Sequence, residues 1–468
     1  MASRTITAEE THIAQELRAR AERAMAAIAD SDQATVDRMC QAVAWATANM
    51  ETAVRLANMS VDESGMGSRE PTRRSKVLGI LRDALRQKSM GVIEEIPEKG
   101  IVKYAKPAGV ICALIPVTSP YITPIGIAIY AIKCKDAVIF SPHPSSRKTT
   151  NEVVRLMRSA LKQLGIAEDV LQCVERPTIP LANQLMSTCD LTIATGGPAM
   201  VKAAYSSGKP AYGVGAGNAT MVIDETADIE DAARNTRISK TNDHGSGCSA
   251  DGNLLVEASI YDRFLEQLQQ EGGYLVDAQE KQRLQHAYWD EQGRRTPDTI
   301  ARSAAVVAAK AGIDLPSDKT FFIVPETRIG KEHPFSTEKL GVVLSIFKCS
   351  GFDEALEKVR QIFETGGKGH SCGIYSFNDD HINRLALAAP VSRIMVRQVQ
   401  SRSNAGTFTN GMPMTSSMGC GVWGGNITNE NISLKHYMNV TWVSRPIAED
   451  KPGEEELFGE FYNSAVTV

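Results

Sequence analysis

The sequence lacks an apolar run long enough to cross a bilayer, and it lacks any long basic stripe. Its longest apolar stretches, near 108–117 and 125–134, are much shorter than the roughly 20 residues of a spanning helix. The net charge of −4 makes nucleic acid and anionic membranes unfavourable partners. Glu9 and Glu10 stand where a secretion signal would need apolar residues, so we expect a cytoplasmic protein.

The sequence also lacks the closely spaced cysteines and histidines that hold zinc. None of its nine cysteines forms a CxxC pair, and none of its eight histidines stands in an HExxH motif. An odd number of scattered cysteines does not fit a disulfide framework and is typical of a reducing compartment. We therefore expect free thiols and no protein-bound metal.

The N-terminal part of the chain is predicted to be helical. Apolar residues recur at three- and four-residue spacing over 8–30, 33–59 and 71–88, which predicts three amphipathic helices. We assign these helices to packing and give them no chemistry. Residues 91–107 alternate in part and predict a hairpin with its turn at 98–100.

Strands and helices alternate over the rest of the chain, which favours mostly parallel α/β sheets. The first series has predicted strands in 108–117, 137–142 and 170–174, and helices at 123–134 and 147–164. A second series has predicted helices at 260–270 and over the long region 278–311, and strands near 320–324 and 342–347. We therefore expect two α/β domains.

One cysteine, Cys248, lies in a run of small residues, SKTNDHGSGCSADG at 239–252. Such a loop buries little apolar surface. Its glycines let backbone N–H groups approach a carbonyl group bound to the sulfur. The loop alone leaves two interpretations open, a nucleophilic thiol or a spare surface cysteine.

Three stretches before this loop are suited to binding a nicotinamide cofactor. TGGPAMVKAA (195–204) follows a predicted strand and opens a helix whose free N–H groups could receive a pyrophosphate; a plain tight turn is the alternative. GVGAGNAT (213–220) would place bare backbone beside a ligand or another loop. SPHPSSRKTT (141–150) combines hydroxyls with positive charge and has no acid, which favours binding of a ribose 2′-phosphate. The alternative is that this stretch is simply the solvated start of a helix.

Together these stretches resemble the CoA-acylating branch of the aldehyde dehydrogenase superfamily. The matching motifs are SPHP at 141–144, ATGGPAMVKAAYSSGKPAYGVGAGN at 194–218, SKTNDHGSGC at 239–248, HPFSTEKLGVVL at 333–344, GHS at 369–371 and GCGVWGGN at 419–426. They follow one another in the family's order. The resemblance implies an α/β fold with two Rossmann-like domains and a small β extension for oligomerisation.

The resemblance also implies a division of the chain and roles for single residues. Residues 1–90 and 108–240 are expected to form the cofactor domain, 241–430 the catalytic domain, and 91–107 with 431–468 the oligomerisation extension and tail. Cys248 matches the nucleophile that forms a thiohemiacetal and then a thioester, and Glu338 matches the carboxylate that holds the nicotinamide ribose. The other positions that match the binding of NADP or NAD are Ser141, His143, Ser145, Arg147, Lys148, Thr195, Gly196, Gly197 and Gly215.

A missing acid predicts the fate of the thioester. Hydrolytic aldehyde dehydrogenases carry a glutamate upstream of the cysteine as a base for water, whereas the matching stretch 213–217 has no carboxylate. Without that base, the thiol of CoA is the expected acceptor. His370 matches a histidine that assists the thiol or contacts CoA, with a structural histidine as the alternative. Ser119 replaces the family's oxyanion-stabilising asparagine, and Thr118 competes for that role.

Three further residues bear on the substrate. Arg397 and Arg402 stand where members of the family tend to be neutral, and His244 lies just ahead of the cysteine. Arginines beside a pocket suit an anionic substrate, which with the basic stretch at 141–150 indicates oxidation of sulfoacetaldehyde with NADP and CoA. Acetaldehyde, propionaldehyde or succinate semialdehyde with NAD is the alternative. A further alternative is that these arginines bind the phosphates of CoA or form salt bridges between subunits.

Two other classes of protein fit less well. The missing glutamate disfavours a hydrolytic aldehyde dehydrogenase, and the intact cysteine and cofactor turn disfavour an inactive scaffold. The family implies a homodimer or homotetramer, with 91–107 and the strand near 437–445 as the pairing material. Association with a bacterial microcompartment stays open.

Overall fold

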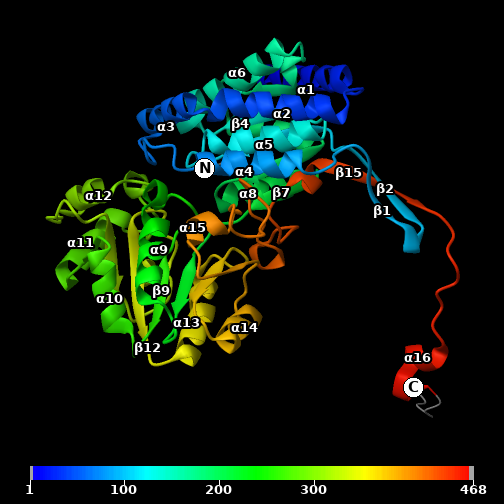
Figure 1. Ribbon diagram of the computed structural model, residues 1–468. Helices are drawn as coiled ribbons and strands as arrows, with labels where there is room; N and C mark the ends of the chain where they lie inside the picture. Colours follow the sequence, from blue (N-terminus) through cyan, green and yellow to red (C-terminus); the bar gives the residue numbers. More distant parts are fainter. Residues whose placement is uncertain (1–3, 463–468) are drawn as a thin grey trace.

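The computed structural model describes residues 4–462, which form two α/β domains and a narrow arm that projects from them (Figure 1). The upper domain in Figure 1 contains a five-stranded sheet in the order β5-β4-β3-β6-β7, and each neighbouring pair is parallel. Its strands are β3 (Val110–Ile115), β4 (Ala137–Pro142), β5 (Leu171–Cys173), β6 (Leu191–Thr195) and β7 (Ala211–Val214). Its helices are α1 (Ala8–Ile28), α2 (Gln33–Ala48), α3 (Met50–Ser64), α4 (Arg74–Leu85), α5 (Ile122–Lys133), α6 (Arg147–Gln163), α7 (Ile179–Thr188) and α8 (Pro198–Tyr205).

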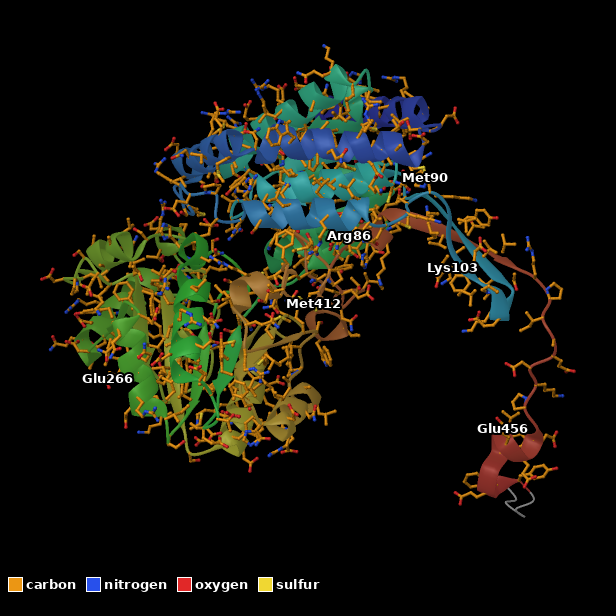
Figure 2. The ribbon with its side chains drawn as sticks, in the orientation of Figure 1. Arg86, Met90, Lys103, Glu266, Met412 and Glu456 are labelled. Atoms are coloured by element: carbon orange, nitrogen blue, oxygen red, sulfur yellow. The ribbon has the colours of Figure 1, made fainter. Side chains whose placement is uncertain are left out.

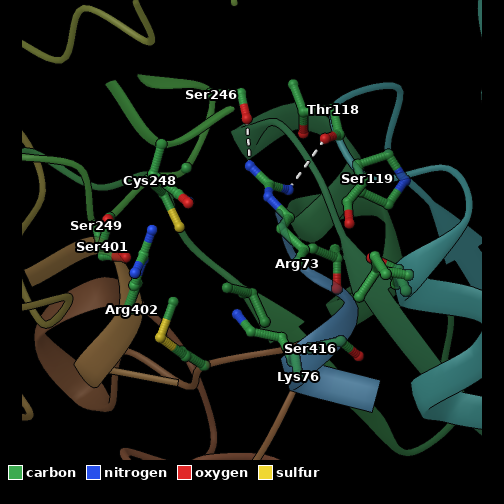
Figure 3. Close-up of a pocket in the computed structure, with 18 of the residues that line it drawn as sticks. Arg73, Lys76, Thr118, Ser119, Ser246, Cys248, Ser249, Ser401, Arg402 and Ser416 are labelled. Atoms are coloured by element: carbon green, nitrogen blue, oxygen red, sulfur yellow. Dashed lines mark hydrogen bonds between the residues drawn. The ribbon is translucent and has the colours of Figure 1, made fainter. Parts of the chain in front are cut away.

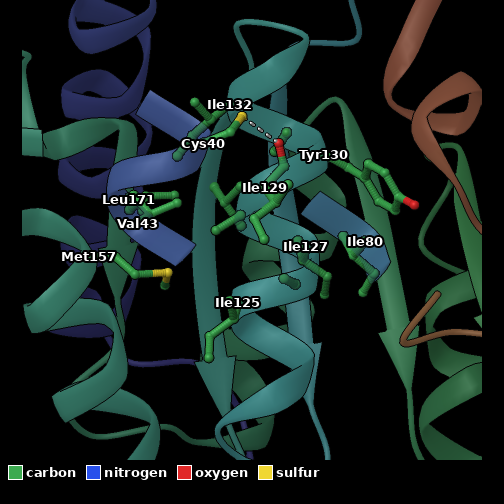
Figure 4. Close-up of a cluster of buried hydrophobic side chains, with 14 of the residues drawn as sticks. Cys40, Val43, Ile80, Ile125, Ile127, Ile129, Tyr130, Ile132, Met157 and Leu171 are labelled. Carbon is green, nitrogen blue, oxygen red and sulfur yellow. Dashed lines mark hydrogen bonds between the residues drawn. The ribbon is translucent and has the colours of Figure 1, made fainter. Parts of the chain in front are cut away.

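Helix α5 lies at the centre of this domain, and each of its residues is buried. Its sequence ITPIGIAIYAIK is apolar on all sides because α2 and α4 cover it while β3 and β4 lie beneath it. Figure 4 shows its isoleucines among side chains such as Val43, Met157 and Leu171. Each fully buried isoleucine contributes roughly 1.5–3 kcal/mol of apolar burial. This core fixes the sheet whose strand ends carry the predicted cofactor stretches.

The second domain contains a seven-stranded parallel sheet in the order β10-β11-β12-β9-β8-β13-β14. Its strands are β8 (Thr220–Ile223), β9 (Asn253–Glu257), β10 (Gly273–Leu275), β11 (Phe321–Pro325), β12 (Val343–Cys349), β13 (Cys372–Tyr375) and β14 (Ile394–Val396). Its helices are α9 (Ile229–Thr241), α10 (Tyr261–Gln270), α11 (Ala278–Tyr288), α12 (Ala304–Ala311), α13 (Phe352–Thr365), α14 (Asp379–Ala388) and α15 (Gln400–Ser403). The prediction of two parallel α/β domains is confirmed.

The expected domain boundaries need two corrections. Residues before 240 were expected in the first domain, but β8 pairs with β9 and β13 in the second sheet, with Thr220 opposite Asn253. The crossing therefore lies between β7 and β8. Residues 431–437 were expected in the extension, but Leu434 and Tyr437 are buried in the core of the first domain. Apolar burial therefore holds that segment in place.

The predicted helices differ from the structure in their limits. The helix expected over 33–59 is two helices, because Asn49 ends α2 and its side chain accepts a hydrogen bond from Thr52 N at 3.0 Å as the cap of α3. The helical region expected over 278–311 is α11 and α12. Gly293, with φ +73°, and Pro297 lie between them. The helix expected over 71–88 begins at Arg74 and ends at Leu85.

The arm is an antiparallel sheet of β1 (Gly91–Ile96), β2 (Ile101–Pro107) and β15 (Met438–Ser444), in the order β1-β2-β15. The predicted hairpin is confirmed, with a turn that ends at Gly100 in the left-handed region at φ +61°. Figure 2 shows Lys103 on this arm, away from both domains; its ammonium lies 4.2 Å from the ring centre of the exposed Trp442. Beyond the arm lies the short α16 (Glu454–Phe458). Within 4–462, no helix has the length and apolar character needed to cross a membrane.

Candidate active site

The loop that carries Cys248 connects α9 with β9 and takes a sharp turn just before the cysteine. Asp243, His244 and Gly245 all have left-handed backbone angles, with φ of 51°, 52° and 68°. The loop then packs against Gly217, where an added Cβ would lie 1.9 Å from the carbonyl oxygen of Cys248. Only glycine fits at 217, so the stretch that lacks a carboxylate touches the cysteine directly.

Cys248 is in direct contact with His370. The imidazole Nε2 lies 2.9 Å from the cysteine Sγ, and Nδ1 lies 2.8 Å from Ser371 Oγ. Burial raises the pKa of Cys248 to about 12, so the free enzyme holds a protonated thiol at neutral pH. Burial and the nearby Arg393 charge lower the pKa of His370 to about 3, so the imidazole is neutral. Both groups are therefore neutral in the free enzyme, and the contact places a ring nitrogen within reach of the thiol proton.

A cavity of about 880 Å³ opens in front of Cys248 (Figure 3). It is lined by residues of both domains, which is a common position for a small-molecule site. Eleven of the residues singled out from the sequence line it: Thr118, Ser119, His143, Thr195, Gly196, Gly197, Gly215, Cys248, Glu338, Arg397 and Arg402. The six that do not are Ser141, Ser145, Arg147, Lys148, His244 and His370, of which His370 contacts Cys248 from outside the lining.

Glu338 is the sole carboxylate among the described residues that line the cavity. Its Oε1 accepts a hydrogen bond from Gly217 N at 3.0 Å. Burial raises the pKa of Glu338 to about 7. The carboxylate is thus held on the glycine stretch beside the cysteine loop.

Two of the expected substrate residues do not present their side chains as predicted. The Arg397 guanidinium donates a hydrogen bond to the Ser376 carbonyl and lies 4.3 Å from the centre of the Phe377 ring, and neither partner lines the cavity. His244 lies outside the lining. Both residues have positive φ, 51° at Arg397 and 52° at His244, so neither follows the direction that extended chain would give. Arg402 does point into the cavity, opposite α4 (Figure 3).

Sequence reasoning assigned helix α4 to packing alone, but residues at its N-terminal end line the cavity. Arg73, immediately before α4, forms an ion pair with Asp243 at 2.8 Å and also contacts the Ser246 hydroxyl. Its other nitrogen donates to the Thr118 carbonyl at 3.2 Å (Figure 3). Arg73 therefore joins the cysteine loop to the loop that carries Ser119. A run of cations at a helix N-terminus, where the helix dipole disfavours them, was the available signal.

Sequence reasoning also missed Glu63. This residue of α3 accepts hydrogen bonds from Lys148 N at 2.8 Å and Thr149 N at 2.7 Å, and so caps the start of α6. The basic stretch at 141–150 contains no acid, but the fold brings one to it from 85 residues away. The N-terminus of α6 therefore already has an anionic partner, and the polar side chains of Ser145, Arg147 and Lys148 are exposed beside it.

The model of the aldehyde dehydrogenase family matches residues 4–443, and the chain belongs to this family. It is 42% identical over 449 residues to a sulfoacetaldehyde dehydrogenase of an Acholeplasma species, covering 94% of this chain and 93% of that protein. It is 38% identical to a sulfoacetaldehyde dehydrogenase (acylating) of Bilophila wadsworthia, covering 94% and 97%. Within the family the chain therefore belongs to the acylating branch.

A solved structure agrees with this placement. An acetylating aldehyde dehydrogenase of Geobacillus thermoglucosidasius superimposes with a TM-score of 0.91 and is 33% identical, covering 95% of this chain and 99% of that one. The predicted family, the two-domain fold and the enzyme class are confirmed.

Proposed function

We propose that this protein oxidises sulfoacetaldehyde to sulfoacetyl-CoA, with NADP as the hydride acceptor and CoA as the thiol acceptor. The observation that carries this proposal is the cavity itself. A nucleophilic cysteine paired with a neutral histidine opens onto a space lined by the cations Arg73, Lys76 and Arg402. The relatives named sulfoacetaldehyde dehydrogenase support the same substrate.

His370 starts the reaction by accepting the Cys248 thiol proton at Nε2, which requires the tautomer in which Nδ1 donates to Ser371. The sulfur then attacks the aldehyde carbon and forms a thiohemiacetal. The Cys248 N–H and the Ser119 hydroxyl, which lines the cavity, are the proposed donors to the oxyanion. When bound, the nicotinamide cofactor accepts the hydride, which leaves a thioester on Cys248.

The CoA thiol then attacks the thioester, and His370 takes the thiol proton once its first proton has gone to solvent. The Cys248 thiolate leaves as acyl-CoA forms. Water competes poorly because no carboxylate occurs in 213–217. Glu338, the remaining acid of the lining, is hydrogen-bonded to Gly217 and is proposed to hold the nicotinamide ribose. The net reaction consumes aldehyde, CoA and oxidised cofactor and releases acyl-CoA, reduced cofactor and one proton.

The residues at the start of α8 fit the pyrophosphate of the cofactor. Gly197 caps this helix without a side-chain hydrogen bond, Pro198 has no N–H, and Met200 N donates to the Gly197 carbonyl at 3.0 Å, so Ala199 supplies the first-turn N–H proposed to meet the pyrophosphate. Gly196 and Gly197 line the cavity, and a Cβ built on Gly197 would meet no atom within 4 Å. The turn thus leaves open space over bare backbone. His143 was also predicted to bind the cofactor. It lines the same cavity and lies just after the end of β4.

The first prediction concerns the aldehyde. We expect kcat/KM for sulfoacetaldehyde to exceed that for acetaldehyde and propionaldehyde by about 100-fold. The uncharged aldehydes bring no anion to the unpaired cations of the cavity, so those cations stay without a partner. Succinate semialdehyde, with a carboxylate on a longer chain, should fall between them. Formation of reduced cofactor, followed by absorbance with and without CoA, measures this order. A preference for the uncharged aldehydes would overturn the substrate, and product formed equally well without CoA would overturn the acceptor.

The second prediction concerns NADP. Because Glu63 occupies the N-terminus of α6, the charged partners left for a 2′-phosphate there are the exposed side chains of Arg147 and Lys148, with the Ser145 hydroxyl nearby in sequence. The double variant Arg147→Ala/Lys148→Ala should raise KM for NADP by about 10-fold and change KM for NAD by less than about two-fold. Lys162→Ala, an exposed lysine at the far end of the same helix, is the matched control. Equal effects on both cofactors would count against 2′-phosphate recognition at this stretch.

The arm is proposed to join subunits into a homodimer or homotetramer. Strands β1 and β15 are both edge strands, and β15 exposes Val440, Trp442 and Val443. Edge strands with apolar side chains favour pairing with another chain. Light scattering of the purified protein tests this proposal, and a monomer at micromolar concentration would contradict it.

A further inference from the structure

Lys76 is a cation of the active-site cavity that takes part in none of the proton, hydride or acyl transfers. It lies in the first turn of α4, in a helix that pattern analysis assigned to packing. Figure 3 shows its side chain pointing into the cavity. Cys248 and Arg402 lie across the cavity from it, on the catalytic domain. The two cations thus face the space in front of the nucleophile from different domains.

Neither Lys76 nor Arg402 has a side-chain hydrogen-bond or ion-pair partner among residues 4–462. The other cations of the lining are engaged, Arg73 by Asp243 and Arg397 by the Ser376 carbonyl. The lining's carboxylate, Glu338, accepts from Gly217. The cavity therefore holds two cations that no carboxylate of the described residues pairs with.

The position of Lys76 makes its unpaired charge unfavourable in the free enzyme. The positive end of the α4 dipole and the neighbouring Arg73 both repel an ammonium there. Burial and the Arg73 charge lower the pKa of Lys76 to about 8, which leaves most of the side chain protonated at neutral pH. A partly buried charge without a partner is stabilised strongly by an anion brought beside it.

We propose that Lys76 and Arg402 form an anion-binding subsite that holds the sulfonate of the aldehyde while its carbonyl carbon faces Cys248. This inference rests on the proposed function. In sulfoacetaldehyde one methylene separates the sulfonate from the carbonyl carbon, so the anion must lie in the cavity of Cys248. The predicted phosphate partners of the cofactor are other residues, at the start of α8 on another part of the lining and on the exposed start of α6. Lys76 therefore serves the substrate.

Steady-state kinetics of Lys76→Met test the subsite. We expect KM for sulfoacetaldehyde to rise by about 100-fold with kcat changed by less than about three-fold, because the lost contact is made equally in the ground and transition states. kcat/KM for propionaldehyde should fall by less than about three-fold. Lys76→Arg should recover most of the affinity, and Arg402→Ala should show the same split as Lys76→Met. Lys88→Met, an exposed lysine just after α4, is the matched control.

Two outcomes would overturn the inference. An equal loss for sulfoacetaldehyde and propionaldehyde in Lys76→Met would assign Lys76 to the nucleophile or to folding. A rise in KM for CoA alone would assign it to the co-substrate.

A binding readout separates failure of the subsite from failure of the proposed function. Ethanesulfonate, which carries the anion without the aldehyde, should protect Cys248 from alkylation by neutral iodoacetamide in the wild-type protein and fail to do so in Lys76→Met. Protection in both proteins, or in neither, overturns the subsite. Lys76-dependent protection in an enzyme that does not prefer sulfoacetaldehyde would uphold the subsite and reject the proposed substrate.

Discussion

Replacing Cys248 with alanine is expected to lower acyl-CoA formation by on the order of 10⁴-fold or more, because no other group can form the thioester. The methyl group of alanine cannot take part in thiohemiacetal formation, and His370 loses the thiol whose Sγ lies 2.9 Å from its Nε2. The cofactor turn at Gly196 and Gly197 belongs to the other domain and is untouched by the change. Affinity for NADP should therefore change by less than about two-fold.

Two measurements check this expectation. Single-turnover assays follow reduced cofactor with and without CoA, and quenching of protein fluorescence follows NADP binding. Cys173→Ala is the matched control, because Cys173 is the other cysteine of the nine that is only partly buried. It should keep full activity. Turnover retained in Cys248→Ala would overturn the thioester mechanism, and lost cofactor binding would indicate a collapsed site.

Local sequence patterns predicted the features that depend on neighbouring residues. Strand and helix periodicity located the two parallel sheets, and small residues around Cys248 indicated a loop in which a thiol could react. The arm hairpin follows from alternation and from the glycine that ends its turn. The ordered motifs then indicated the family. These features are encoded over short stretches, so no knowledge of the tertiary fold was needed.

The rest of the site depends on contacts between distant parts of the chain. Arg73 meets the cysteine loop from 173 residues away, and Glu63 reaches α6 across 85 residues. No periodicity reports such contacts, because they are set by how α3 and α4 pack on the first domain. Proximity in sequence was misleading at His244, which the left-handed turn before the cysteine carries out of the cavity lining. In the proposed subsite, Arg402 keeps its predicted role and Lys76 takes the place expected of Arg397.

The contact between His370 and Cys248 supports the prediction with the second largest effect. His370→Ala should lower the rate of thiohemiacetal formation by about 10²- to 10⁴-fold, the usual range for loss of a general base. In the wild type, burial lowers the pKa of His370 to about 3, and the Arg393 charge is a second cause. The imidazole is therefore unprotonated across neutral pH. The wild-type rate should therefore be nearly flat between pH 6 and pH 8, because this range begins about three units above the pKa of His370.

The variant should respond to pH differently. Without the imidazole, attack depends on the spontaneously formed thiolate, and burial raises the pKa of Cys248 to about 12. Because the deprotonated form reacts and the pKa lies above the assay range, the rate should rise about tenfold for each pH unit. His370→Gln, which fills the space without supplying a base, should behave like His370→Ala. Ser371→Ala should cost only about 10-fold, since it loosens the tautomer and leaves the base in place. A flat pH profile in both His370 variants would contradict the base and leave His370 a packing residue.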